Sequence, residues 1–304
     1  MPAVDFPTWF LSLVLAPFGL LLGSFANVLI HRLPLEAPAD RDVVRKPSHC
    51  PACKARIRPV HNIPVLSWIW LRGRCAACGA RIPIRYPLVE LLGGALLAGS
   101  VWVFPIGTLI WAKGVICGYA LIVLFFTDLT AFILPDAIQF PLMGLGVLLT
   151  LPQLAWPFRL VSVWAPGPSL LQVDATANGI QPAPAWPFLG GRVTWLDSLL
   201  GLAIGYGVPW LLNRVYRAVR KTDGIGMGDF KMLAWLGAFW GWGPMLGILF
   251  GGALLGSAVG LPLMLFRKTG GQTMLPFGCT LALATPVVVF YGPALWMAYL
   301  GVLR

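Results

Sequence analysis

Residues 222–242 read TDGIGMGDFKMLAWLGAFWGW and place an aspartate, Asp229, directly before an apolar segment. Four basic residues between positions 214 and 221 precede this stretch. A carboxylate at membrane depth costs about 3 kcal/mol on insertion scales, so an acid at the mouth of a hydrophobic helix indicates a function. A second acid, Asp128, follows the apolar run GYALIVLFFT at 118–127. We therefore expect the two aspartates to meet.

Composition identifies the class of protein around these acids. The 304 residues are 58% hydrophobic and only 11% charged, and their mean hydropathy of +0.80 excludes an ordinary soluble domain. Crossing the hydrocarbon core takes about 20 apolar residues. The sequence therefore predicts an all-α polytopic membrane protein with about eight transmembrane helices, two of them short, at 9–30, 88–106, 109–127, 137–151, 198–212, 230–242, 245–266 and 281–303.

The distribution of positive charge predicts the orientation of these helices. No basic residue precedes the first apolar run, which is unlike a cleaved secretory signal, so this run is expected to remain as a helix. The net charge is +11, yet 11 of the 22 Lys and Arg residues lie between Arg32 and Arg85. Such clustering between helices indicates the cytoplasmic side of a membrane rather than nucleic-acid binding. Eight spans then place Asp128 and Asp229 at the same cytoplasmic surface.

The basic loop after the first helix contains two CxxC pairs. Cys50 and Cys53 form the first pair, and Cys75 and Cys78 follow after 21 intervening residues. Two such pairs can hold one Zn²⁺ through four thiolates, as in zinc ribbons. Disulfides are the alternative, but a cytosolic loop is a reducing environment. The remaining two cysteines, at positions 117 and 279, lie in or beside apolar segments and are expected to be packing residues.

The predicted organisation has five parts. A proline- and tryptophan-rich segment between two apolar regions is expected to be an extracytoplasmic insertion. The parts are a first helix at 1–31, the basic CxxC loop at 32–87, helices two to four at 88–151, the outer insertion at 152–197, and the last four helices at 198–304.

Two aspartates meeting at the edge of a dry site are expected to share one proton near neutral pH. An aspartic protease uses this arrangement, in which the ionised acid activates water and the protonated acid polarises the scissile carbonyl. Gly226 and Gly228 lack side chains, so the backbone beside Asp229 could approach an extended substrate closely. Asp128 and Asp229 are therefore the candidate catalytic pair.

Several motifs in order resemble one family. They are GSFANVLIHRLP at 23–34, the paired CxxC motifs with NIPVLSWIWLRGRC between them, RYPLVELL at 85–92, TDL followed by LPD at 127–136, and GMGDFKMLAWLGAFWGW at 226–242. Together they resemble the type 4 prepilin leader peptidases. The GxGD motif also resembles that of presenilin-type intramembrane proteases.

The resemblance implies a bifunctional enzyme of the bacterial inner membrane. Such an enzyme cleaves the basic leader of prepilins and pseudopilins after a Gly on the cytoplasmic face, and then N-methylates the new terminus from S-adenosylmethionine. The family's catalytic aspartates correspond to Asp128 and Asp229, and its metal- and methylation-associated part is the CxxC loop. The interval between the two aspartates is longer than expected for the family, and the excess lies in the outer segment. Type IV pilus and type II secretion subunits are the implied substrates.

Two other classes of function remain open at this point. Cytoplasmic aspartates beside Arg and Lys could hold Mg²⁺ in a membrane glycosyl- or phosphotransferase that acts on a lipid-linked diphosphate. The protein could also be a zinc-anchored scaffold without enzymatic activity. The oligomeric state does not follow from the sequence.

Overall fold

The computed structural model describes residues 6–35, 41–43, 47–104, 106–151, 193, 195–267 and 276–302. These residues are almost entirely helical, and their β pairing is limited to two isolated bridges, between His49 and Arg56 and between Arg74 and Arg81. The predicted all-α class is confirmed. The chain forms two compact units. The first comprises Met1–Ile106 with Gly114–Thr127, and the second comprises Gly107–Lys113 with Asp128–Arg304.

Two long helices form the frame of the first unit. They are α1 (Thr8–Arg32) and α3 (Arg85–Val103), and between them lie the CxxC pairs, the 3₁₀ helix η1 (Pro59–Asn62) and the short helix α2 (Leu66–Trp70). The two long helices approach each other through glycines. A Cβ atom added to Gly19 would lie 2.5 Å from the Gly93 oxygen, and one added to Gly23 would lie 2.6 Å from Cα of Glu90. Small residues at this spacing permit close packing of membrane helices.

Helix α4 (Leu109–Ala131) ends beside the first acidic site. Phe132 takes a left-handed conformation with φ of 54° directly after the helix. Pro135 then occupies the cap position before α5 (Asp136–Leu148). A proline at this position prevents α4 from continuing into α5. The turn between α4 and α5 is therefore short and bent.

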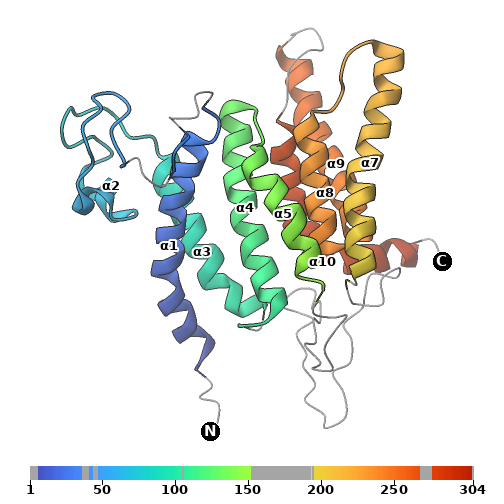
Figure 1. The fold of residues 1–304 in the computed structure, drawn as a ribbon, viewed down its shortest axis with the longest axis horizontal. Helices are drawn as coiled ribbons and strands as arrows, with labels where there is room; N and C mark the ends of the chain where they lie inside the picture. The colour runs from blue at the N-terminus through green and yellow to red at the C-terminus, as the bar shows by residue number, and fades with distance from the viewer. Residues whose placement is uncertain are drawn as a thin grey trace. The chain divides into compact units, whose positions relative to one another are not determined.

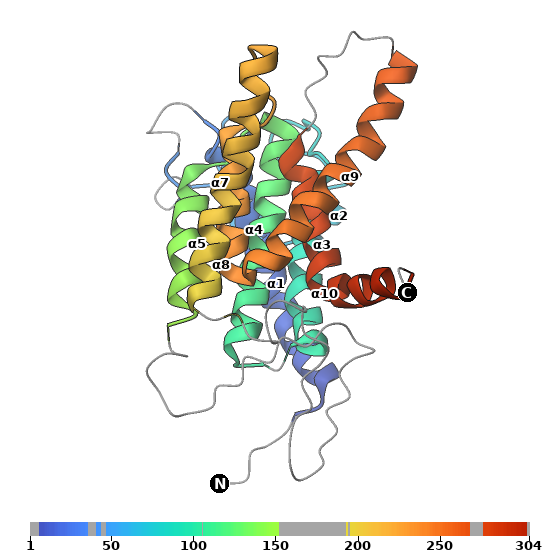
Figure 2. The same ribbon diagram turned by 90° about the vertical axis from the view of Figure 1, so that its right-hand side faces the viewer.

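Helix α8 (Met227–Trp240) is the core of the second unit. It contacts α5, α7 (Trp195–Arg220), α9 (Trp242–Arg267) and α10 (Phe277–Val302) (Figures 1 and 2). The large side chains of Trp235 and Phe239 are fully buried. A helix that is apolar on all sides belongs in a protein interior. At a rise of about 1.5 Å per residue α8 is only about 21 Å long, so neighbouring helices shelter a segment shorter than the membrane core.

Each of the eight apolar runs predicted from the sequence coincides with a helix. Among the described residues, five helices are long and apolar enough to cross a membrane: Thr8–Arg32, Arg85–Val103, Leu109–Ala131, Trp195–Arg220 and Trp242–Pro262. Asp136–Leu148 and Phe277–Gly292 are shorter apolar helices. A count of eight membrane crossings stays a prediction. Most of the predicted outer segment, residues 152–192 and 194, lies outside the described residues.

Candidate functional site

Asp128 lies in the last turn of α4 and belongs to the second unit. Its side chain is only 5% exposed. The backbone N–H of Cys279, in the first turn of α10, donates a 2.9 Å hydrogen bond to Oδ2 of Asp128. The first N–H groups of a helix have no partner within that helix, so a carboxylate is a favourable acceptor for them. This bond fixes the Asp128 carboxylate against the start of α10.

Asp229 lies in the first turn of α8 and is 8% exposed. Its backbone N–H donates a 3.1 Å hydrogen bond to the oxygen of Gly226. The Asp128 and Asp229 carboxylates interact electrostatically with each other, and both also interact electrostatically with the Cys279 thiol. The structure thus brings the two predicted aspartates into one electrostatic environment, at the ends of three helices, α4, α8 and α10.

Small residues make room around these carboxylates. A Cβ atom at Gly226 would lie 3.2 Å from Oδ2 of Asp229, and one at Gly228 would lie 3.0 Å from Cβ of Leu134. Neither glycine has a positive φ. Glycine at these two positions therefore lets the backbone lie close to Asp229 and Leu134, and it is not required by an unusual backbone conformation.

Sequence reasoning missed two residues of this site. A Cβ atom at Gly278 would lie 2.9 Å from Oδ2 of Asp128 and 3.0 Å from Cδ1 of Leu134. Cys279 was expected to be a packing residue, and it is indeed buried, but its backbone N–H also binds Asp128. The only sequence signal was a Pro, Phe and Gly at 276–278, shortly before the last apolar run. These residues do not indicate that the segment contacts Asp128, which lies about 150 residues earlier in the chain.

The loop that leads into α8 is held by a side chain of α7. Oδ1 of Asn213 accepts hydrogen bonds from the backbone N–H groups of Gly224 (2.8 Å) and Ile225 (3.2 Å), and its Nδ2 donates to Asp223 at 2.9 Å. Arg217 also donates to Asp223, and its hydrogen bonds, with that of Asn213, hold the pKa of Asp223 below its usual range. This arrangement links α7 to the residues directly before Gly226.

A second polar contact connects α8 to α5. Nζ of Lys231 donates a 2.6 Å hydrogen bond to Oδ1 of Asp136 and lies 5.0 Å from the ring centroid of Phe140. Asp136 is the first residue of α5, and Pro135 occupies the cap position. The carboxylate of Asp136 thus forms an ion pair with Lys231. We do not assign to Asp136 the catalytic role considered for Asp128 and Asp229.

The four loop cysteines come together in the first unit. Their sulfur atoms all lie within 4.8 Å of one another, and the sulfurs of Cys50 and Cys78 are 3.9 Å apart. Sulfur pairs of a tetrahedral Zn²⁺ site are about 3.8 Å apart, given a Zn–S distance of about 2.3 Å. The cluster could therefore hold a metal ion with little rearrangement.

The two CxxC pairs adopt the same local structure. The N–H of Cys50 binds the oxygen of Ala55, and the N–H of Cys75 binds that of Ala80. A residue with positive φ follows each pair, with 59° at Lys54 and 70° at Gly79. A turn of this kind directs the two thiols of a pair to one side. The sequence CPACKAR at 50–56 is therefore a structural repeat of CAACGAR at 75–81.

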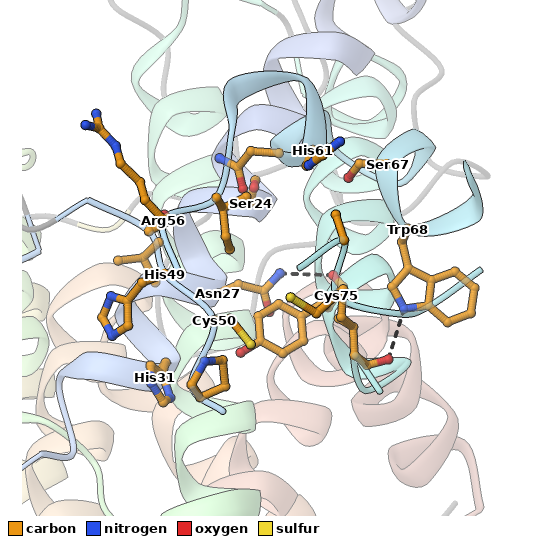
Figure 3. Close-up of a pocket in the computed structure, with 18 of the residues that line it drawn as sticks. Ser24, Asn27, His31, His49, Cys50, Arg56, His61, Ser67, Trp68 and Cys75 are labelled. Atoms are coloured by element: carbon orange, nitrogen blue, oxygen red, sulfur yellow. Dashed lines mark hydrogen bonds between the residues drawn. The ribbon is translucent and has the colours of Figure 1, made fainter. Parts of the chain in front are cut away.

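A pocket of about 790 Å³ lies next to the cluster, between the C-terminal half of α1, the cysteine loop and the first turns of α3. Figure 3 shows His31 and His49 toward one end of this pocket and Trp68 toward the other. Asn27 of α1 donates from Nδ2 to the oxygen of Tyr86 at 2.9 Å. The pocket lies wholly within the first unit.

Comparison with known proteins identifies the family of this chain. Residues 18–104 match the bacterial peptidase A24 N-terminal domain, and residues 180–261 match the type IV leader peptidase family. A prepilin leader peptidase/N-methyltransferase of Aeromonas hydrophila is 34% identical, over 97% of this chain and 95% of that protein. The chain belongs to the prepilin leader peptidase/N-methyltransferase family.

Other members of this family are similar along nearly the whole chain. A protein of the same name from Stutzerimonas stutzeri is 30% identical over 94% of this chain and 92% of its own length. One from Burkholderia pseudomallei (strain 1026b) is 31% identical over 92% of this chain and 85% of its own length. No solved structure matches the chain. The leader peptidase match contains Asp229, the N-terminal match contains the four cysteines, and Asp128 lies between the two matched ranges.

Proposed function

We propose that this chain is a membrane aspartic endopeptidase that removes the basic leader of type IV prepilins and pseudopilins after a Gly. The cleavage takes place on the cytoplasmic face of the bacterial inner membrane. The observation that carries this proposal is the pair of buried carboxylates, Asp128 and Asp229, within electrostatic range of each other at three helix ends. Buried acids that act on each other are typical of sites that perform acid–base chemistry.

The two acids would act on a water molecule and on the scissile amide. One carboxylate is ionised and accepts a proton from the water as the water attacks the carbonyl carbon. The other carries a proton and donates it to the carbonyl oxygen, and the departing amine then takes a proton from the pair. The hydrogen bond from Cys279 N–H orients the Asp128 carboxylate for this work.

The residues before α8 would position the substrate. Gly226 and Gly228 leave the backbone beside Asp229 accessible to an extended peptide, which can form main-chain hydrogen bonds there. Asn213 holds the preceding loop through the N–H groups of Gly224 and Ile225. A Gly before the cleaved bond in the substrate suits this site, because it has no side chain to obstruct close contact between the two backbones.

The same chain would carry a second activity, N-methylation of the terminus that cleavage exposes. The names of the relatives include N-methyltransferase, and S-adenosylmethionine supplies the methyl group in the reaction that we propose. We assign a structural Zn²⁺ to Cys50, Cys53, Cys75 and Cys78, whose closeness suits tetrahedral thiolate coordination. A loop of this size gains much of its folding free energy from such an ion.

The competing transferase hypothesis has no support in the comparisons. The relatives described above are named as peptidases and methyltransferases. We therefore retain the peptidase as the proposed function, with prepilin or pseudopilin substrates and the lipid bilayer as its partners.

Leader cleavage by the purified protein tests this proposal. A prepilin with a basic leader, a Gly and then a Phe is incubated with wild type, Asp128→Asn and Asp229→Asn in detergent. We expect cleavage after the Gly by wild type, resistance to EDTA during the assay, and loss of cleavage by roughly 10⁴-fold in each variant, since the members of a catalytic unit act together. Cleavage by either variant at the wild-type rate would contradict the proposal.

A further inference from the structure

One apolar side chain lies between two of the helix ends that form the acidic site. Leu134 belongs to the turn that joins α4 to α5. A Cβ atom added to Gly228, directly before Asp229, would lie 3.0 Å from Cβ and 3.3 Å from Cδ1 of Leu134. One added to Gly278 would lie 3.0 Å from Cδ1 and 3.1 Å from Cδ2 of the same leucine. Leu134 therefore lies against the first turn of α8 and the first turn of α10.

The space beside this leucine is also bordered by a candidate catalytic carboxylate. The same added Cβ at Gly278 would lie 2.9 Å from Oδ2 of Asp128. The methyl groups of Leu134 and this carboxylate oxygen thus flank one small space. Leu134 is half-buried, unlike Trp235 and Phe239 of α8, which are fully buried. Part of its surface is therefore available to contact a substrate.

Contacts on both sides fix the position of Leu134. Nε2 of Gln139, a fully buried side chain of α5, donates a 3.0 Å hydrogen bond to the oxygen of Leu134. Pro135 follows directly and restricts the backbone of the residue before it. The ion pair between Asp136 and Lys231 connects the next residue to α8. A leucine on a backbone held in this way does not move aside easily to admit a larger substrate.

The substrate residue whose carbonyl is attacked has to come close to this space. In the proposed cleavage, water attacks the carbonyl carbon of the residue before the cleaved bond, and the reacting atoms have to lie about 3–3.5 Å apart. The Cα atom of that residue is bonded to the carbonyl carbon at about 1.5 Å, and any side chain begins one bond further on. The side chain after the cleaved bond is attached beyond the nitrogen. The residue before the cleaved bond is therefore the one whose Cβ would meet the walls of the acidic site.

These walls leave too little room for that Cβ. Contacts between carbon atoms become unfavourable below about 3.5 Å, and the methyl groups of Leu134 already lie closer than this to the position of a Cβ on Gly278. A protein rejects an unwanted ligand by such clashes as well as by the contacts that it makes with the correct one. The space beside Asp128 therefore suits backbone atoms and excludes a side chain.

We propose that Leu134 restricts cleavage to substrates with Gly before the cleaved bond, an assignment that rests on the proposed peptidase function. Leu134 takes no part in the chemistry, because it has no polar group. It occupies the space that a side chain on this substrate residue would need. A smaller residue at position 134 opens that space, so that Ala before the cleaved bond becomes acceptable. The preference for the residue after the cleaved bond does not depend on Leu134.

Two substrates that differ by one methyl group test the assignment. The full-length protein in detergent receives a prepilin with a basic leader and either Gly or Ala before the cleaved bond, and kcat/KM is measured for each. For wild type we expect kcat/KM to be about 100-fold higher with Gly, within the range that one such group is worth in a shaped site. In Leu134→Ala this ratio should fall about tenfold or more, because kcat/KM for the Ala substrate rises relative to that for the Gly substrate.

Two matched variants separate specificity from packing. Leu134→Met keeps nearly the same volume, so we expect it to keep the wild-type ratio. Leu142→Ala removes the same atoms from a leucine in the middle of α5 that is 7% exposed, and it should lower thermal stability without changing the ratio. A general loss of stability lowers kcat/KM for both substrates alike. The ratio therefore reports on the space beside the leucine and not on the stability of the protein.

A milder variant keeps the test decisive if Leu134→Ala cleaves neither substrate. Leu134→Val shortens the side chain by one carbon, and its ratio should lie between those of wild type and a full truncation. A third substrate, with Ala in place of Phe after the cleaved bond, should be cleaved by wild type and Leu134→Val with the same relative kcat/KM. A changed preference at that position alone would overturn the assignment.

The outcomes distinguish this assignment from the proposed function. If wild type cleaves the Gly substrate and the active variants at position 134 reject the Ala substrate as strongly as wild type does, the assignment is wrong and the proposed function stands. An equal change of the ratio in Leu142→Ala would also overturn it, since loosened packing would then be the cause. If wild type cleaves neither substrate, the proposed function fails, and the assignment of Leu134 fails with it.

Discussion

The backbone N–H of Cys279 donates a 2.9 Å hydrogen bond to Oδ2 of Asp128, across 151 positions of the sequence. One carboxylate is thereby both a candidate catalytic group and an acceptor for a backbone N–H in the first turn of α10, which also binds the oxygen of Pro276 at 3.2 Å. The stability of this helix end and the geometry of the site consequently depend on the same side chain.

Substitutions of Asp128 should separate these two roles. Asp128→Asn keeps an oxygen acceptor for Cys279 N–H and removes the acid, whereas Asp128→Ala removes both. We expect both variants to lose leader cleavage. Asp128→Ala should also be less stable than Asp128→Asn by about 1 kcal/mol, as for other helix-cap deletions. Thermal unfolding in detergent measures the difference, and equal stability of the two variants would contradict the capping role.

A methyl group at position 278 should disturb the acidic site. In Gly278→Ala the new Cβ would lie 2.9 Å from Oδ2 of Asp128, closer than carbon and oxygen normally approach. The carboxylate has to shift, and a displacement of about 1 Å in a catalytic group costs on the order of 100-fold in rate.

The matched control for this substitution is Gly144→Ala on α5, where an added Cβ meets no atom within 4 Å. Initial rates of leader cleavage provide the comparison. We expect Gly144→Ala to retain the wild-type rate. Similar rates for the two variants would mean that the space at Gly278 is not needed.

Loss of the Asn213 side chain should affect catalysis more than folding. Asn213→Ala removes Oδ1, the one atom that accepts hydrogen bonds from the backbone N–H groups of both Gly224 and Ile225. The loop before Gly226 then keeps only the contact between Arg217 and Asp223 among its side-chain hydrogen bonds to α7. We expect kcat/KM for leader cleavage to fall about tenfold, equivalent to one hydrogen bond of about 1.4 kcal/mol.

Ser198→Ala on the same helix is a suitable control for Asn213→Ala. Ser198 is buried and donates a 2.7 Å hydrogen bond to the oxygen of Ala238, away from the loop. Both variants lose a buried polar contact, so both should lose some thermal stability. Only Asn213→Ala should lower kcat/KM, and an equal decrease in both would point to a general loss of stability.

The cysteine cluster should be required for metal binding and not for leader cleavage. Cys53→Ser removes one of four thiolates, and we expect the metal content per protein, measured by mass spectrometry, to fall from about one ion to nearly zero. Cleavage should persist because Asp128 and Asp229 belong to the other unit.

Cys117→Ser is the control for this experiment. Cys117 is buried in α4 and lies outside the cluster, so its replacement should leave the metal content unchanged. A full metal complement in Cys53→Ser would contradict the assignment of four thiolate ligands.

Patterns that are local in the chain could be predicted from the sequence. Apolar runs at 9–30 and 109–127 become helices because the bilayer requires each segment to satisfy its own backbone hydrogen bonds. The CxxC spacing likewise predicted the cluster, since a tight turn directs the two thiols of each pair to one side. The positions of Asp128 and Asp229 at helix ends followed from the charge pattern in the same way.

Relations between distant segments appeared only in the folded chain. Nothing along the sequence distinguishes Gly278 or the N–H of Cys279 from ordinary helix-packing positions, because their significance comes from Asp128, about 150 residues earlier. The pocket beside the cysteine cluster likewise combines Asn27 of α1 with Glu90 of α3, which belong to separate segments of the chain. Periodicity and spacing report what a segment does alone, whereas side-chain packing determines which segments become neighbours, and in this protein the neighbours complete both sites.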